Sequence, residues 1–249
     1  MSPLISIKGL TKRFGTLAAT NDVSVDIEAG GILSIIGPNG AGKTTFFNLM
    51  TGFLKPDAGT ITYKNQDITG KRPHQIIRYG LSRSFQVVSL FDELSVLDNV
   101  RIGVQRNLGF MNRMFLNYKD ADAVTEKSLE ILERIGLKDL AYHTAASIPH
   151  GDRKILDLGM TLTTGPETIL LDEPMAGLSK IERVRITQLI KELGATHKVI
   201  IVEHDMDLVF GISAYILVLH HGSFLAMGTP KEIAANKEVQ SAYLGLEVA

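Results

Sequence analysis

The fold of this chain is decided by the stretch Gly37-Pro38-Asn39-Gly40-Ala41-Gly42-Lys43-Thr44-Thr45. It matches the pattern G-x-x-x-x-G-K-[ST] in full, and we call it the phosphate loop. Because glycine has no Cβ, a glycine-rich backbone can wrap closely around a phosphate and point successive N–H groups at it. We therefore expect this loop to bind the phosphates of a nucleotide. Lys43 would reach the β- and γ-phosphates, and the Thr44 hydroxyl would bind Mg²⁺.

The sequence on both sides of the phosphate loop has the character that such a loop requires. Before it, Ile32–Ile36 is a nearly continuous apolar run, which is typical of a strand buried on both faces. After it, Lys43–Gly52 predicts a helix whose N-terminus would face the phosphates. This context favours a phosphate site over the alternative, a glycine-rich turn that merely contains Lys-Thr.

A second predicted strand, Thr168–Leu171, is followed directly by the acidic residues Asp172 and Glu173. Ligands of a parallel sheet bind at the carboxyl ends of its strands, so these acids would lie beside the phosphates. Asp172 suits a role in holding Mg²⁺, directly or through water, and Glu173 suits a general base for an attacking water. Together the two motifs indicate a P-loop nucleotidase.

The rest of the chain predicts an α/β fold with a mixed or parallel sheet. Apolar and polar residues alternate at Ile5–Ile7 and Val23–Ile27, as in half-buried strands, which places an antiparallel β part at the N-terminus. Between Pro73 and Ala146 the pattern is helical, and Ala121–Ile135 is amphipathic. From Ile148 onward helices alternate with strands, which implies a parallel sheet with covered faces.

We expect a single domain over residues 1–249. Its core would comprise residues 1–86 and 161–249, and a helical subdomain would be inserted over about 87–160. Residues 107–119 are rich in Met and Asn and poorly periodic, so we interpret them as an insertion.

The composition excludes some classes of protein. Lys and Arg number 26 against 27 Asp and Glu, a net charge of -1, which lacks the basic footprint of a nucleic-acid partner. The chain has no cysteine, which excludes disulfides and thiolate chemistry. It contains no apolar run near the roughly 18 residues that span a bilayer. Lys8 lies within the only apolar stretch of residues 1–10, so we do not interpret the start of the chain as a signal peptide. We therefore expect a cytoplasmic chain that reaches a membrane only by docking on other subunits.

Further motifs resemble those of the ATP-binding subunits of ABC transporters, in order and spacing, over nearly the whole chain. That family places an aromatic residue that stacks on adenine before the phosphate loop, and Phe14 lies there; the alternative is a ring in the core. Gln86 resembles the family's glutamine loop, which contacts Mg²⁺ or the attacking water. His204 follows an apolar strand, Val199–Val202, and resembles the family's switch histidine.

This resemblance implies ATP as substrate and Mg²⁺ as cofactor. The catalytic residues would be Glu173, His204 and Gln86, and Thr44, Gln86 and Asp172 would lie at the metal. Phe14 and the phosphate loop would bind ATP.

The family's signature pattern, Leu-Ser-Gly-Gly-Gln, falls here on Ile148-Pro149-His150-Gly151-Asp152. In the family this signature segment binds the γ-phosphate of the ATP held by the opposite subunit. Pro149 offers neither a hydroxyl nor an N–H, so Gly151 and the helix N-terminus would remain to act. We expect Asp152 to cap the helix, with a charge that would repel phosphate if it faced it. Ser179 stands where the family commonly has an aspartate in its dimer-facing loop.

Several details resemble the subunits that serve uptake of branched-chain and other hydrophobic amino acids. They are the insertion at 107–119, Ala176–Leu178, Glu203–Val209, Gly228–Pro230 and Ala242–Gly245. This resemblance implies two membrane-spanning permease subunits, a second ABC ATPase that is identical or related, and indirectly an extracytoplasmic solute-binding protein. The chain would lie on the inner face of the membrane, and no nucleic acid would be a partner. The cargo would be branched-chain amino acids or related amides and urea.

Three alternatives stay open at this point. An ATPase of a lipid or polysaccharide exporter would share the same motifs. A soluble ABC ATPase would act on ribosomes or DNA, although such proteins usually carry two cassettes or a long coiled coil. A non-hydrolysing regulatory module draws support only from the unusual signature segment.

Overall fold

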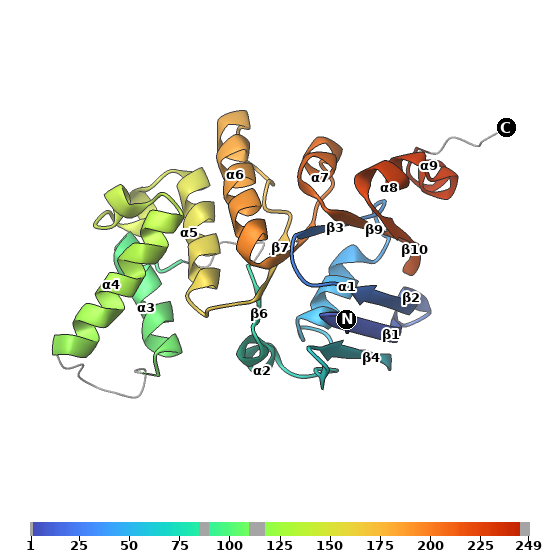
Figure 1. Cartoon of the computed structure of the whole chain (residues 1–249), viewed down its shortest axis with the longest axis horizontal. Coiled ribbons are helices and arrows are strands. Elements are labelled where there is room, and N and C mark those ends of the chain that lie inside the picture. The colour runs from blue at the N-terminus through green and yellow to red at the C-terminus, as the bar shows by residue number, and fades with distance from the viewer. Residues whose placement is uncertain (1, 85–89, 110–117, 245–249) are drawn as a thin grey trace.

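The computed structural model describes residues 2–84, 90–109 and 118–244, and it confirms the α/β fold class (Figure 1). Its strands are β1 (Ile5–Phe14), β2 (Leu17–Ile27), β3 (Ile32–Ile36), β4 (Ala58–Tyr63), β5 (Gln66–Asp67), β6 (Leu81–Arg83), β7 (Thr168–Asp172), β8 (Lys198–Val202), β9 (Tyr215–His220) and β10 (Ser223–Gly228). Its helices are α1 (Lys43–Met50), α2 (Pro73–Ile76), α3 (Val96–Asn107), α4 (Tyr118–Arg134), α5 (His150–Leu162), α6 (Lys180–Thr196), α7 (Met206–Ile212), α8 (Pro230–Ala235) and α9 (Lys237–Leu244).

The six-stranded sheet β10-β9-β3-β8-β7-β6 forms the centre of the molecule, and its strands pair in parallel except for β10. Successive side chains of a strand point to opposite faces. In β8, Val199 and Ile201 accordingly pack with the helices α3 to α6, whereas Ile200 and Val202 pack with α1 and the N-terminal strands. Because both faces are covered, the central strands are nearly continuous apolar runs, as the sequence predicted for β3.

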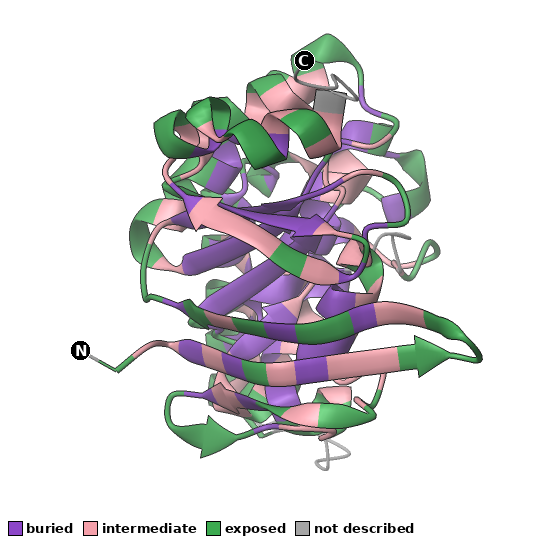
Figure 2. Cartoon of the chain, turned by 90° about the vertical axis from the view of Figure 1, so that its right-hand side faces the viewer, coloured by how far each residue is buried: buried purple, intermediate pink, exposed green. Residues whose placement is uncertain are grey.

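The second sheet, β2-β1-β4-β5, is antiparallel and confirms the N-terminal β part. Its two long strands are much longer than predicted (Figure 2). The prediction was too short because register shifts interrupt the pairing of β1 with β2 after Ile7 and after Leu10. Each bulge reverses the alternation of apolar and polar residues, so the sequence pattern stops where the strand continues. Phe14 is the last residue of β1 and pairs with Leu17.

The prediction of an all-helical stretch from Pro73 to Ala146 is wrong at β6. Three residues are too few for a period-two pattern to appear, and this strand exists because it pairs with β7. The amphipathic helix is present as α4 and begins slightly earlier than predicted. Of the predicted insertion at 107–119, residues 110–117 lie outside the described residues.

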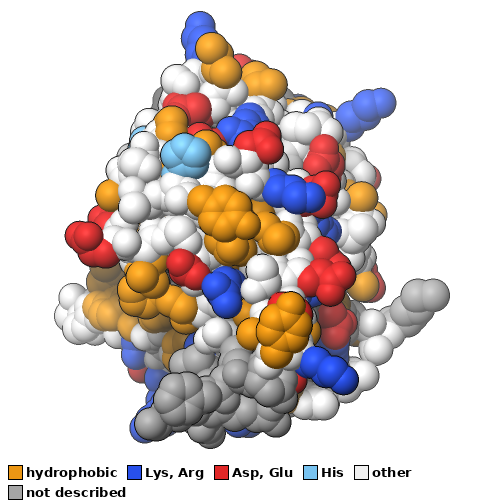
Figure 3. Space-filling model, turned by 90° about the vertical axis from the view of Figure 1, so that its left-hand side faces the viewer, with side chains coloured by type: hydrophobic (Ala, Val, Ile, Leu, Met, Phe, Trp, Pro, Cys, Tyr) orange, Lys and Arg blue, Asp and Glu red, His pale blue; other side chains and the backbone are white. Residues whose placement is uncertain are grey.

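The end of the molecule that α3, α4 and α5 form carries exposed apolar side chains (Figure 3), among them Tyr118 and Tyr142, each 81% exposed. Within the described residues, no helix has both the length and the apolar character needed to cross a bilayer.

One buried charge costs this fold stability at neutral pH. Lys198 opens β8, is only 4% exposed, and donates from Nζ to the Gly30 carbonyl at 2.9 Å. Burial lowers the pKa of Lys198 to about 8, although the negative charge of Glu28 opposes the effect. Below that pKa the folded chain must hold a charged ammonium out of water.

We expect Lys198→Met to raise the free energy of unfolding at pH 7 by up to about 3 kcal/mol. The advantage should shrink as the pH rises from about 8 to 10.5, because the folded wild type loses its proton there while the unfolded chain keeps it. Urea unfolding at pH 7, 9 and 10.5 measures this, with the exposed Lys191→Met as control. A variant that is less stable at pH 7, with a pH-independent difference, would show that the bond to Gly30 outweighs the charge.

Candidate active site

A cavity of about 470 Å³ lies beside the phosphate loop. The residues that line it come from the β1–β2 hairpin, the phosphate loop and α1, the end of β7 and the β9–β10 turn. They are Phe14, Leu17, Ala18, Ala19, Asn39, Gly40, Ala41, Gly42, Lys43, Thr44, Thr45, Glu173 and His221. The structure therefore brings together Phe14, most of the phosphate loop and Glu173. The sequence analysis missed Leu17, Ala18, Ala19 and His221, which face the loop only through long-range folding.

Phe14 is 48% exposed, so the alternative that its ring belongs to the core is wrong. The Lys12 ammonium lies 5.8 Å from the centroid of the ring. An exposed aromatic ring at the rim of a phosphate site is available for a base to stack on.

The phosphate loop is shaped by close backbone contacts. Gly42 has a φ of 91° and precedes α1, and a Cβ there would collide with the Ala19 carbonyl. Only glycine combines this left-handed conformation with this approach. Among the described residues no side chain caps α1, so its first N–H groups are available to an anion.

Lys43 lies at the centre of the loop. Its Nζ donates to the carbonyl oxygens of Gly37 at 2.7 Å and Pro38 at 3.1 Å. Burial lowers the pKa of Lys43, and the negative charge of Glu173 opposes that shift. The cation and the acid therefore lie close together beside the loop, where the sequence predicted them.

Asp172 and Glu173 end β7 at the carboxyl edge of the sheet. Asp172 is 5% exposed, and burial raises the pKa of its carboxyl while Arg83 opposes the shift. Glu173 leaves the strand with a φ of 47° and donates its N–H to the Val202 carbonyl at 2.9 Å. In this left-handed conformation Glu173 lines the cavity.

The available oxygens suit Mg²⁺. The ion prefers hard oxygen ligands and uses one or two carboxylates together with substrate phosphates. A carboxylate at Asp172 and a hydroxyl at Thr44, beside a loop that suits phosphates, are such a set. Thr44 lines the cavity, whereas the Asp172 carboxylate lies outside its lining and is bonded to Arg83, so Asp172 suits a ligand that holds the ion through water.

Arg83 was missed by the sequence analysis. Its Nη2 donates to Asp172 Oδ2 at 2.7 Å and its Nη1 to Asn48 Oδ1 at 2.5 Å. The guanidinium lies between the rings of Phe47 and Phe53, at 4.9 and 5.2 Å from their centroids. It thus fixes the predicted metal ligand to α1, the helix that follows the phosphate loop. Arg83 ends β6, the strand that pairs with β7. A cation at the end of the strand beside the acidic residues was the sequence signal that could have identified it.

His204 follows β8 as predicted, but its side chain is 67% exposed and does not line the cavity. Its N–H donates to Glu203 Oε2 at 3.1 Å. Glu203 is buried and accepts from Met175 N at 3.0 Å, so it holds the segment that follows Glu173. Gln86 lies outside the described residues.

The signature segment leads into α5, with Pro149 before the first helical residue, His150. The prediction that Asp152 caps this helix is wrong, because Pro149 is at the cap position and no described side chain makes a capping bond there. The Asp152 carboxylate is instead paired with Arg185 of α6, which offsets its charge. The Gly151 N–H donates to Glu182 Oε1 at 2.9 Å. The N–H expected to meet the partner's phosphate is therefore held by a carboxylate of the same chain.

Ser179 acts as a helix cap. Its N–H donates to Glu182 Oε2 at 2.8 Å, and its hydroxyl accepts from Glu182 N at 3.4 Å. This reciprocal capping box starts α6. One carboxylate, Glu182, thereby joins the start of α6 to the signature helix α5.

The fold, the phosphate loop and the acids at the end of β7 define a P-loop ATPase. Residues 20–176 match the model of the family described as "ABC transporter", and residues 225–249 match that described as "Branched-chain amino acid ATP-binding cassette transporter".

Similar curated proteins cover the whole length. The chain is 41% identical to the high-affinity branched-chain amino acid transport ATP-binding protein LivG of Salmonella typhimurium, over 98% of both chains. It is 38% identical to BraF of Pseudomonas aeruginosa, which has the same description, again over 98% of both. A crystal structure of an ATP-binding cassette of an ABC transporter, in its ADP conformation, superposes with a TM-score of 0.85 at 29% identity and covers 99% of this chain and 100% of that one. The chain belongs to the ABC transporter family and is an ATPase of that class.

Proposed function

We propose that this chain hydrolyses ATP to power an importer of branched-chain amino acids or related small solutes such as amides and urea. The observation that carries the proposal is the family match of the C-terminal segment, residues 225–249, whose described part forms β10, α8 and α9. The names of the full-length relatives support it. An exporter uses the same ATP chemistry, so the C-terminal segment is what favours import.

The site suits attack of water on the γ-phosphate. The phosphate loop binds the phosphates, Lys43 compensates their charge, and Phe14 stacks on adenine. Glu173 takes the proton of the attacking water. Gln86 and His204 would orient that water, and the exposed His204 side chain would have to turn toward the cavity to do so. Mg²⁺ held by Thr44, Asp172 and Gln86 would neutralise charge that develops on the phosphates.

The signature segment, Pro149 to Asp152, is proposed to complete the site of a second ATPase subunit, identical or related to this chain. The α5 N-terminus offers its dipole to the partner's ATP. For Gly151 to bind that phosphate, its N–H must leave Glu182. Clamping of ATP between the subunits would therefore also break this hydrogen bond between α5 and α6.

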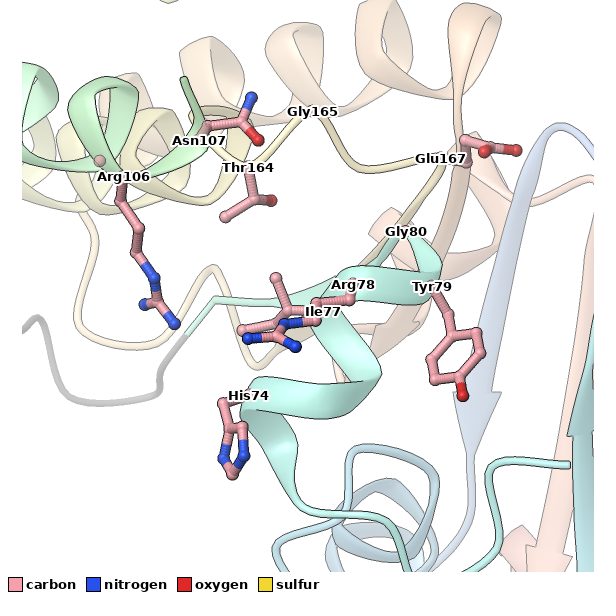
Figure 4. Close-up of a pocket in the computed structure, with 11 residues that line it drawn as sticks. His74, Ile77, Arg78, Tyr79, Gly80, Arg106, Asn107, Thr164, Gly165 and Glu167 are labelled. Atoms are coloured by element: carbon pink, nitrogen blue, oxygen red, sulfur yellow. The ribbon is translucent and has the colours of Figure 1, made fainter. Parts of the chain in front are cut away.

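A second cavity suggests where the permease subunits dock. It measures about 530 Å³ and lies between α2, the end of α3 and the segment before β7 (Figure 4). Arg106 extends from α3 toward Arg78 and His74 on the opposite wall. The two arginines favour an acidic segment as the occupant of this part of the cavity, and Glu167, which also lines it, is paired with Lys64. We place a cytoplasmic loop of the permease there, which would hold the chain at the inner face of the membrane.

The test is recovery of partners from gently solubilised native membranes with tagged Glu173→Gln protein and Mg-ATP. Two polytopic membrane proteins, with or without a second ATPase, are the expected result, and an associated solute-binding protein would identify the cargo. Adding Arg78→Glu and Arg106→Glu should reduce that recovery at least fivefold, because each change places a like charge against the acidic loop. Lys231→Glu on α8 is the control for a charge reversal elsewhere.

Other recoveries would contradict the proposal. Ribosomal or DNA-associated proteins would indicate a soluble ABC ATPase. Membrane proteins from an operon without a solute-binding protein would favour an exporter. Unchanged recovery with the double charge reversal would remove the docking site and leave the ATPase assignment intact.

A further inference from the structure

A side chain of the last described helix contacts the start of the phosphate loop. The Gly37 N–H donates to the Tyr243 hydroxyl oxygen at 3.0 Å. Gly37 follows β3 and opens the loop, whereas Tyr243 lies on α9 within the C-terminal segment that the branched-chain family model matches. The contact thus joins the family-specific end of the chain to the general ATP-binding element.

Gly37 has little room to move away from this contact. A Cβ at Gly37 would collide with the Leu219 carbonyl of β9 and approach the Ala41 side chain to 2.9 Å. The first residue of the loop is therefore enclosed by β9 on one side and by the tyrosine hydroxyl on another. Burial raises the pKa of Tyr243, so its hydroxyl stays neutral and keeps an acceptor lone pair at physiological pH.

Helix α9 is seated on the strand that leads into the loop. Val239 of α9 belongs to a buried cluster with Ile36, the last residue of β3, and Tyr243 packs against the same cluster. Further along the loop, the Ala41 carbonyl accepts from the Gly222 N–H of the β9–β10 turn at 3.1 Å. The C-terminal part of the chain therefore holds the loop at its first residue through a side chain and at its middle residue through turn backbone.

We propose that Tyr243 is a positioning residue for the phosphate loop, through which the docking of α9 sets the affinity for ATP. The proposal rests on the proposed binding of ATP by this loop. If the hydroxyl is lost, the enclosed Gly37 N–H lacks a partner, and the loop relieves that cost by shifting from the geometry that receives phosphates. Coupling between sites is reciprocal, so bound ATP must in turn hold α9 in place. A partner that lifts α9 from β3 would then release nucleotide.

The decisive variant is Tyr243→Phe, which removes the hydroxyl and keeps the ring in the cluster. We expect the Kd for ATP to rise about five- to tenfold, the size of one hydrogen bond. KM should rise in parallel while kcat at saturating ATP stays within about twofold, because Tyr243 does not touch the reacting atoms. Tyr142→Phe, on an exposed tyrosine of the helical end, is the matched control and should leave both constants unchanged.

Hydrogen exchange provides a second measurement that needs no variant. ATP should slow exchange of the α9 amides in the wild type, and this protection should disappear in Tyr243→Phe. Two results would overturn the positioning role. One is a Kd for ATP in Tyr243→Phe equal to that of the wild type, and the other is exchange of the wild-type α9 amides at the same rate with and without ATP. Lys43→Ala separates the two proposals: if it still binds ATP as tightly as the wild type, the phosphate-loop assignment itself is wrong.

Discussion

Replacing Glu173 by Gln is expected to lower ATP turnover by about 10²- to 10⁴-fold, the usual contribution of a general base. Gln keeps the size of the side chain and suits the same left-handed backbone, at a φ of 47°. The Lys43 ammonium and the loop N–H groups remain, so ATP binding should persist or tighten. Turnover is measured as phosphate release, and ATP affinity by equilibrium binding on the same protein.

Because ATP binds but is not hydrolysed, the variant should also accumulate as an ATP-bound pair of subunits, visible by size-exclusion chromatography. Glu167→Gln is the matched control, since Glu167 precedes the first residue of the same strand and its exposed carboxylate pairs with Lys64. It should turn over ATP like the wild type. Unchanged turnover in Glu173→Gln would refute the base assignment and favour a non-catalytic regulatory module.

The elements that could be predicted from the sequence are those with a local cause. The phosphate loop is dictated by glycines whose backbone must approach phosphates. Asp172 and Glu173 could be placed because an apolar strand of a parallel sheet has a known functional edge. His204 was placed at the end of β8 by the same rule, but its exposure depends on the neighbouring segment and could not be predicted.

The features that the sequence did not reveal depend on contacts between distant segments. Arg83 meets Asp172 across 89 positions, and Gly37 meets Tyr243 across 206. No local pattern marks either pair. Asp152 shows the same limit, because its position in the first turn of α5 favoured capping, whereas the folded chain offered Arg185 instead. The length of β1 was hidden by bulges, which exist only in the paired strand.

Replacing Arg83 by Met is expected to lower the free energy of unfolding by about 3–5 kcal/mol, the cost of removing one partner of a buried ion pair. Asp172 would keep a carboxylate that is 5% exposed and has lost its cation. The stacking of the guanidinium between Phe47 and Phe53 would also be lost. Denaturant unfolding at pH 7 measures the change. The half-exposed pair Arg183–Asp205 provides the control, since Arg183→Met should cost no more than about 1 kcal/mol.

A double-mutant cycle identifies the cause of that loss. If the stranded charge of Asp172 dominates, Asp172→Asn should recover part of the stability in the Arg83→Met background while destabilising the wild type. The free energy of unfolding of Arg83→Lys should lie between those of the wild type and Arg83→Met. An ammonium lacks the fixed fork with which the guanidinium bonds both Asp172 and Asn48. A loss no larger than that of Arg183→Met, or purely additive effects of the two substitutions, would show that Arg83 does not hold Asp172 in place. Since Asp172 is also the proposed Mg²⁺ ligand, additivity would show that the bonds of Arg83 to Asp172 and Asn48 do not orient the metal site.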